Sequence, residues 1–175
     1  THPTQWYENI TSDNTQGIDL GPAGSTWGGY KIALDLLGNP DEFDINLILL
    51  PGVTNDMTEG SEVIDYAIQK AESRADCLVL ADQTKYAMGI ASATTQAEGY
   101  DSNYAAMYFP WCQVFDNTTG QYRWVPPSTV LGGVYAFNDK VAQPWFAPAG
   151  LNRGGLDGVI QTEQKLTHAN RDTLY

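Results

Sequence analysis

The first half of the chain contains two short apolar runs separated by a stretch with helical periodicity. Residues 44–50 and 77–81 are almost entirely apolar, which is typical of parallel strands covered on both faces. Residues 58–74 between them place apolar side chains at helical spacing, with acidic residues at the start and basic residues at the end. This order predicts two adjacent parallel strands joined by a helix, and the first strand is expected to end at Pro51-Gly52.

The second half contains a longer apolar run and a hairpin signal. Residues 105–115 are predicted to form one strand, residues 116–120 a tight loop, and residues 121–125 the returning antiparallel strand. A helix is expected after Pro126-Pro127-Ser128, because proline is well tolerated in a first helical turn. Shorter helices are predicted at residues 29–37, 86–96 and 167–175, with a last strand near Ile160.

These elements predict an α/β fold with three layers. We expect one mixed, largely parallel sheet flanked by helices, with the hairpin joined to the parallel strands. Residues 28–175 are interpreted as a single α/β domain, and the polar residues 1–27 as loop or partial strand. The chain does not begin with Met and stops inside a helical pattern, so we expect it to be a fragment of a longer protein.

Charge and hydropathy exclude several classes of function. The 21 acidic and 9 basic residues give a formal net charge of −12, which disfavours direct binding to nucleic acid phosphates. No apolar run approaches the roughly 20 residues that cross a bilayer, so direct membrane insertion is not expected. Cys77 and Cys112 lie in apolar runs and are predicted to be buried, reduced thiols, with a disulfide or a catalytic thiol as the less favoured alternatives.

Catalytic and ligand-binding motifs are weak throughout the sequence. The only histidines are His2 and His168, and nothing in the sequence places either beside a nucleophile. Residues 24–31 resemble a phosphate-binding loop only superficially, because Tyr30 interrupts the required Gly-Lys pair. The acidic residues at 41, 42 and 44 lack the spacing of a calcium loop. We therefore expect no enzymatic activity, no cofactor and no metal.

Aromatic residues, proline and glycine are concentrated between residues 104 and 155. Part of this set is expected to form an aromatic core, but proline-rich loops bearing tryptophan are also typical of protein interfaces. For residues 145–155 both interpretations stay open. The candidate subunit-interface residues are Trp145, Phe146, Pro148, Asn152 and Arg153.

Several short motifs occur in a characteristic order. They are YAAMYFPW at 104–111, WVPPS at 124–128, GGVYA at 132–136, APAG at 147–150 and NRGG at 152–155. Together with the strands at 44–52 and 75–82 and the final segment 166–175, this ordered set resembles the tail sheath proteins of contractile-tailed bacteriophages. The resemblance covers about residues 28–175. The residues that carry the family motifs in the core are Trp111, Trp124, Pro126, Pro127 and Ser128.

The resemblance implies a structural role in a virion. It implies a subtilisin-like topology without protease activity, and stacked hexameric rings around a tail tube that contract to drive the tube through the host envelope. The implied partners are further copies of the subunit, the tail tube protein, and baseplate and tail terminator proteins. Assembly is implied in the host bacterial cytoplasm.

Two alternatives to a phage sheath remain at this stage. One is the sheath of a tailocin or of a type VI secretion-like contractile injection system, and the other is a hydrolase on an α/β sheet. In the family the arms that connect subunits come from the termini, and this chain is expected to lack both arms. We therefore expect this chain alone to be a folded monomer, whereas the full-length protein assembles.

Overall fold

A computed structural model describes residues 28–57 and 60–174, and the polar segment predicted for residues 1–27 lies outside the described residues. Helices and strands alternate through the first half and are followed by a hairpin-containing second half. The helices are α1 (Gly28–Leu37), α2 (Gly60–Arg74), α3 (Ile90–Ala97), α4 (Pro127–Val141) and α5 (His168–Leu174). The strands are β1 (Leu47–Thr54), β2 (Leu78–Asp82), β3 (Ala105–Tyr108), β4 (Cys112–Asp116), β5 (Gln121–Val125) and β6 (Val159–Thr162).

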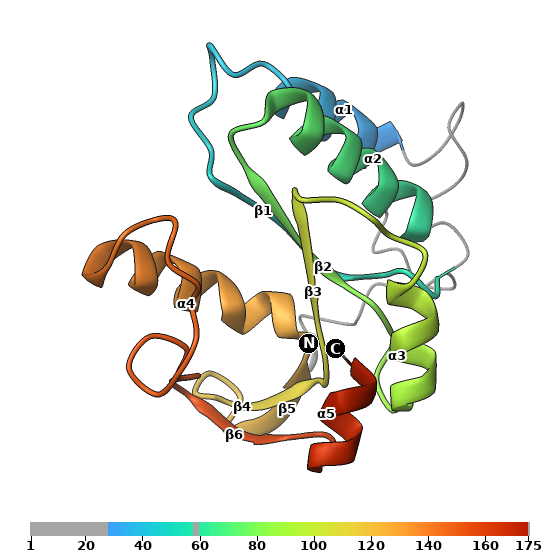
Figure 1. Ribbon diagram of the computed structural model, residues 1–175, viewed down its shortest axis with the longest axis vertical. Coiled ribbons are helices and arrows are strands. Elements are labelled where there is room, and N and C mark those ends of the chain that lie inside the picture. Colours follow the sequence, from blue (N-terminus) through green and yellow to red (C-terminus); the bar gives the residue numbers. More distant parts are fainter. Residues whose placement is uncertain (1–27, 58–59, 175) are drawn as a thin grey trace, which may run out of the picture.

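Three strands form a parallel sheet in the order β1-β2-β3 (Figure 1). Leu47 pairs with Leu78 and Val79 pairs with Ala105, so β2 lies between two parallel neighbours. The predicted pairing of the first two apolar runs is confirmed, and α2 is the helix that connects them. The apolar stripe predicted for this helix is buried along its whole length.

Helices α2 and α4 cover opposite faces of the parallel sheet (Figure 1). Ile48 and Leu50 point into the apolar core together with the buried stripe of α2. Leu49 points the other way, toward α4, where its side chain lies so close to Gly132 that an added Cβ would be 2.9 Å from it. The predicted arrangement of helices on both sides of a parallel sheet is therefore confirmed.

Strand β1 does not end at Pro51-Gly52 as the sequence predicted. It continues to Thr54, and its pairing with β2 shifts register between Leu49 and Thr54. Gly52 has a φ of 87°, a conformation that glycine adopts without steric cost. Because β1 is an edge strand, Pro51 can be accommodated at an irregularity although it has no N–H to donate.

The apolar run 105–115 was predicted to be one strand, and this prediction is wrong. It forms two strands, β3 and β4, which belong to different sheets. Pro110 lies between them and cannot donate a hydrogen bond, so the ladder of β3 stops before it. The expected single mixed sheet is therefore also wrong, because β4, β5 and β6 form a separate antiparallel sheet.

The antiparallel sheet contains the predicted hairpin. Cys112 pairs with Val125 and Asp116 with Gln121, as the hairpin signal indicated. The Asp116 carboxylate accepts hydrogen bonds from the backbone N–H groups of Thr118 and Thr119 and forms an ion pair with Arg123 at 2.9 Å. The Thr119 hydroxyl also donates to this carboxylate at 2.7 Å, and this hydrogen bond, followed by the backbone hydrogen bonds and the Arg123 contact, lowers the pKa of Asp116 to about 2. The last predicted strand becomes β6, which pairs with β4.

Charged groups fasten α1 to the rest of the parallel-sheet region. The Asp35 carboxylate of α1 forms ion pairs with Lys31 at 2.6 Å and with Lys70 of α2 at 2.7 Å, and it also accepts a hydrogen bond from the Tyr66 hydroxyl. The buried Arg74 guanidinium donates to the Leu37 carbonyl at the end of α1. On α1 itself Ala33 is exposed, whereas Leu34 is buried in the core.

Candidate subunit interface

The segment that follows α4 is held in place by contacts to the helix and within itself. The side-chain amide of Asn138 donates to the Phe146 carbonyl at 2.8 Å, which fixes the chain as it leaves α4. The Arg153 guanidinium lies 5.3 Å from the centre of the Phe146 ring and donates to the Ala147 carbonyl at 3.4 Å. An added Cβ at Gly154 would lie 3.0 Å from the backbone at Ala149, so the loop also depends on a small residue there.

This segment exposes large apolar side chains. Trp145 is 77% exposed, Phe146 is 44% exposed and Leu151 is 100% exposed. The Trp145 and Phe146 rings meet edge to face, with centroids 6.4 Å apart. On the adjoining helix α4, Phe137 and Val141 are about half exposed and lie one turn apart. We call these five residues, Phe137, Val141, Trp145, Phe146 and Leu151, the aromatic surface.

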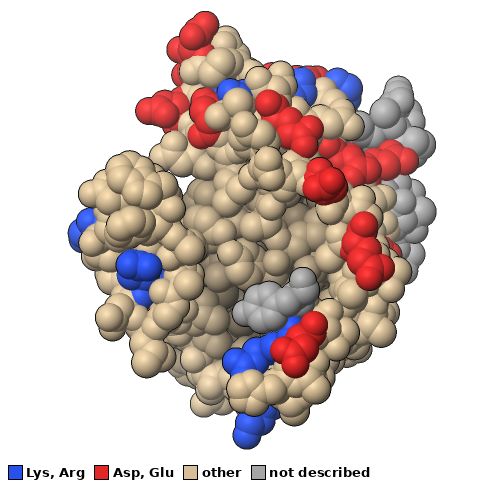
Figure 2. Space-filling model, in the orientation of Figure 1, with Lys and Arg blue, Asp and Glu red and all other residues tan. Residues whose placement is uncertain are grey.

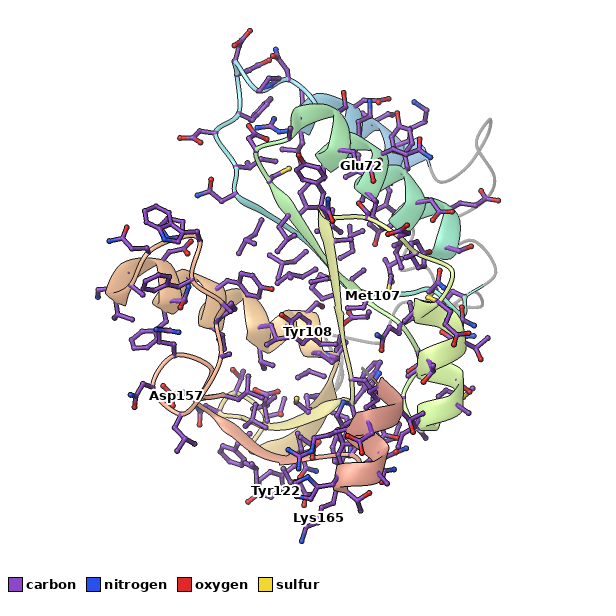
Figure 3. All side chains as sticks on the ribbon, in the orientation of Figure 1. Glu72, Met107, Tyr108, Tyr122, Asp157 and Lys165 are labelled. Carbon is purple, nitrogen blue, oxygen red and sulfur yellow. The ribbon has the colours of Figure 1, made fainter. Side chains whose placement is uncertain are left out.

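A shallow hollow of about 340 Å³ lies between α4 and the segment before β6. Phe137 and Leu151 line it from opposite sides, so the helix and the segment form one continuous surface. Asn152 and Asp157 supply polar atoms to the same hollow, and Figure 3 shows Asp157 in the loop that precedes β6. The hollow is open to solvent and mixes apolar and polar groups, as the rim of a protein interface does.

The predicted interface residues divide into two groups. Trp145, Phe146 and Asn152 are exposed and available to a partner. Pro148 and Arg153 are half-buried, and Arg153 contributes to the shape of the loop through its contact with Phe146. The two remaining members of the continuous surface on α4, Phe137 and Val141, were missed by the sequence interpretation. Their helical spacing was visible, but it is also the spacing of a core-facing stripe.

The motif tryptophans pack around one tyrosine between the two sheets. Trp111 is 4% exposed, and its indole N–H donates to the Thr84 carbonyl at 2.9 Å. The Tyr86 ring lies 5.8 Å from that of Trp111 and 5.3 Å from that of Trp124. This contact joins the loop after β2 to the antiparallel sheet, so both tryptophans have a structural role.

The motif Pro126-Pro127-Ser128 forms the buried start of α4. Asp82, at the end of β2, accepts a hydrogen bond from the Ser128 N–H at 3.1 Å and another from its hydroxyl at 2.7 Å. The carboxylate of Asp82 thus caps a helix that begins 45 residues later, because Pro126 has no side chain that could do so. Burial raises the pKa of Asp82 to about 6, although both hydrogen bonds act in the opposite direction.

Asp82 was not identified as a site residue from the sequence. Its position in the sequence could have identified it: Asp82 directly follows the buried apolar run 77–81, and a charge at such a place needs a partner. A second connection runs parallel to it, since the hydroxyl groups of Tyr108 on β3 and Tyr135 on α4 are 2.7 Å apart. Figure 3 shows Tyr108 between β3 and α4. Helix α4 is therefore attached to the parallel sheet by polar contacts as well as by packing.

The described residues offer little that resembles a catalytic centre. His168 contacts Arg171 of its own helix, and His2 lies outside the described residues. Cys77 and Cys112 are buried and unpaired, as predicted, and burial raises the pKa of both thiols. Among residues 28–57 and 60–174 no three acidic, histidine or cysteine side chains are grouped as metal ligands. In the same part of the chain no helix is long and apolar enough to span a membrane.

Charge is distributed unevenly between the two halves of the chain. Residues 28–108 contain 13 acidic and 4 basic residues, a net charge of −9, whereas residues 109–175 contain 5 of each. Figure 2 shows acidic side chains gathered over the end of the molecule that carries α1 and α2. The surface beside α4 is mostly uncharged, with a few basic side chains. An extended apolar surface and an acidic surface thus lie on different parts of one chain.

Comparison with known proteins finds similarity to tail sheath proteins of bacteriophages. No family model matches the chain. The tail sheath protein of Vibrio phage KVP40 is 29% identical over an alignment covering 91% of this chain and 27% of that protein. The tail sheath protein of Enterobacteria phage T4 is 27% identical, covering 86% of this chain and 26% of that protein.

The resemblance to phage tail sheath proteins is thereby confirmed over most of the chain. Both relatives are named as tail sheath proteins of bacteriophages. The chain spans about a quarter of the length of either relative. What the full relatives do as assembled proteins therefore enters only as a proposal for this chain.

Proposed function

We propose that this chain is part of a structural subunit of a phage contractile tail sheath. In this proposal the complete subunits assemble as stacked hexameric rings around a tail tube, and contraction of the sheath drives the tube through the host envelope. The observation that carries the proposal is the similarity to two phage tail sheath proteins over about nine-tenths of the chain. The proposed partners are other copies of the subunit, the tube protein, and baseplate and terminator proteins.

The physical properties of the chain agree with a role in assembly. The aromatic surface exposes five large apolar side chains, two of which, Phe137 and Leu151, line the hollow, and such a surface favours burial against another protein. The residues predicted as interface, Trp145, Phe146, Pro148, Asn152 and Arg153, lie in or next to it. Tryptophan and arginine are the residue types that most often dominate binding energy at interfaces.

A hydrolase is the weaker alternative. Such an enzyme needs a nucleophile within hydrogen-bonding reach of a base, and the only histidine among the described residues contacts an arginine of its own helix. The two thiols are buried, and burial disfavours the reactive thiolate. The sheath of a tailocin or of a type VI secretion-like contractile injection system is an alternative that shares the same assembly physics.

Electron microscopy of assemblies tests the proposal. The complete protein that contains this chain, expressed alone and purified, should form hollow tubes of regular diameter in negative stain. An antibody raised against residues 28–175 should decorate those tubes along their length. A complete protein that stays dispersed as folded monomers at every concentration and salt condition tested would contradict the proposal.

A further inference from the structure

Helix α1 presents a second exposed apolar surface, far from the aromatic surface in the sequence. Ile32 is 70% exposed and Leu36 is 55% exposed, and the two residues lie one helical turn apart. The opposite side of the helix is already used, because Leu34 is buried in the core. We call Ile32 and Leu36 the α1 surface. It is aliphatic and narrow, and nothing in the described part of the chain covers it.

Acidic groups without an ionic partner border the α1 surface. The loop that follows α1 carries Asp41 and Glu42, both exposed. Glu42 accepts only a long hydrogen bond of 3.4 Å from the Asn39 side chain, and no basic group within the described residues forms an ion pair with either carboxylate. In Figure 1 this loop projects from the end of the molecule that carries α1 and α2. Its negative charge is therefore available to a partner.

Basic groups border the aromatic surface in a matching way. Lys140 is exposed between Phe137 and Val141 on α4, and none of the described carboxylates forms an ion pair with it. Arg153 contacts the Phe146 ring and the Ala147 carbonyl and forms no ion pair with another described residue. Lys140 and Arg153 thus lie at the border of the aromatic surface, whose hollow is also lined by Asp157, and Asp41 and Glu42 lie at the border of the α1 surface.

The loop beside the α1 surface carries acidic residues, whereas Lys140 and Arg153 beside the aromatic surface are basic. If the aromatic surfaces of two copies met, Lys140 and Arg153 of one copy would face the same cations of the other. If two α1 surfaces met, the acidic loops would repel each other in the same way. A contact between the two different surfaces avoids the repulsion between like charges and buries aromatic against aliphatic side chains. Contacts between two different surfaces produce closed rings or open helical filaments.

We propose that the aromatic surface of one copy binds the α1 surface of a second copy, head to tail. The inference rests on the proposed function, since it assumes that the protein assembles with itself. Trp145 and Leu151 supply the apolar contact with Ile32 and Leu36. Lys140 lies against the acidic loop that contains Asp41 and Glu42. This contact assigns a direction to each neighbouring pair of subunits.

Charge reversal in the complete protein tests the pairing. Lys140→Glu and Glu42→Lys should each raise the concentration needed for tube assembly about threefold, because each places like charges at the edge of the contact. The double variant carries both changes, so a head-to-tail contact again brings opposite charges together, and assembly should return to nearly the wild-type concentration. Trp145→Ala should raise that concentration about 30-fold, as the loss of a central tryptophan does at other interfaces.

The matched control is Lys165→Glu, which reverses an exposed lysine outside both surfaces and should assemble like the wild type (Figure 3). Circular dichroism of each variant as a monomer establishes that it is folded. If wild-type protein forms tubes but all the single variants assemble equally well, the pairing is wrong while the sheath function stands. If the single variants need a higher concentration to assemble and the double variant needs a higher one still, the two surfaces meet other partners, and the inference is overturned. Failure of the wild-type protein to assemble contradicts the proposed function itself.

Discussion

Residues 28–108 and residues 109–174 distribute their apolar side chains in opposite ways. Among the described residues, the first region contains 15 of the 18 buried apolar core side chains, and the second contains three. The second region has eight of the 12 large apolar side chains that are exposed. The first region also carries a net charge of −9, whereas the charges of the second region cancel. The first region thus holds most of the buried apolar core, whereas the second exposes most of the large apolar side chains that reach the surface.

A subunit needs both a stable core and an exposed surface for association, and the two regions contribute to them unequally. A parallel sheet with helices on both faces buries its strands completely and gives a rigid base. The antiparallel sheet and the segment after α4 attach to that base through a few defined contacts, such as the one between Asp82 and Ser128. Changes in the buried core of the first region should therefore alter folding, and changes at the exposed side chains of the aromatic surface or the α1 surface should alter association.

The largest expected effect is on the stability of the first region. Ile64 is fully buried on α2, so Ile64→Ala should lower the free energy of unfolding of the chain by about 3–4 kcal/mol. Trp145→Ala removes a larger side chain, but one that is 77% exposed, and should change stability by less than about 0.5 kcal/mol. Urea unfolding followed by circular dichroism measures both. Equal losses in the two variants would remove the distinction between the regions.

An intermediate effect is expected where the two regions join. The folded state raises the pKa of Asp82 from 3.8 to about 6, so the folded protein holds this proton more tightly than the unfolded chain does. The contribution of Asp82 to stability is therefore largest below pH 4 and is lost as the pH rises through 6, a difference of roughly 3 kcal/mol. Asp82→Asn stays neutral at every pH and should lack this dependence.

Urea unfolding at several values between pH 4 and pH 7 measures the dependence on Asp82. The informative quantity is the difference between wild type and Asp82→Asn, because the pKa of Asp116 is lowered by its own contacts and that residue responds to pH in the opposite sense. Asp82→Ala is the control for the lost hydrogen bonds, since it leaves the buried N–H of Ser128 without its acceptor. A difference that does not change with pH would show that the Asp82 carboxyl is not held neutral by burial.

The smallest expected effect concerns the end of α2. Ala75 follows the helix with a φ of 59°, a left-handed conformation in which alanine is strained and glycine is not. Ala75→Gly should stabilise the chain by about 0.5–1 kcal/mol. Ala136→Gly, at an exposed position well inside α4, should destabilise it by a similar amount and serves as the matched control. Thermal unfolding of the two variants should shift in opposite directions, and a shift in the same direction would exclude strain at Ala75.

The sequence predicted the local elements of the first region well. Two apolar runs and the helix between them gave the parallel pair β1 and β2, because a buried parallel strand and an amphipathic helix have different periodicities. The sequence did not predict the division of residues 105–115 between two sheets. A run of apolar side chains shows that a segment is covered, but it does not show which strand pairs with it. Pro110, which cannot donate a backbone hydrogen bond, was the sequence feature that marked the break between β3 and β4.

The candidate interface was only partly predictable. Trp145 and Phe146 could be singled out because they lie among prolines and glycines that exclude a regular core element. Phe137, Val141, Ile32 and Leu36 have the spacing of core-facing helical residues, and only the structure shows that they face outward. Asp82 illustrates the same limit, since its partner Ser128 lies 46 positions away in the sequence.

The measurement that most directly tests the central claim is immunogold electron microscopy of the virions that contain the protein. Antibody against residues 28–175 should label the tail along its whole length, and after contraction the label should follow the shortened, widened sheath and leave the protruding tube unlabelled. An antibody against the major capsid protein, which should label only the head, serves as the control. Label confined to the head, the tube or the baseplate would contradict the account of this chain as part of the tail sheath.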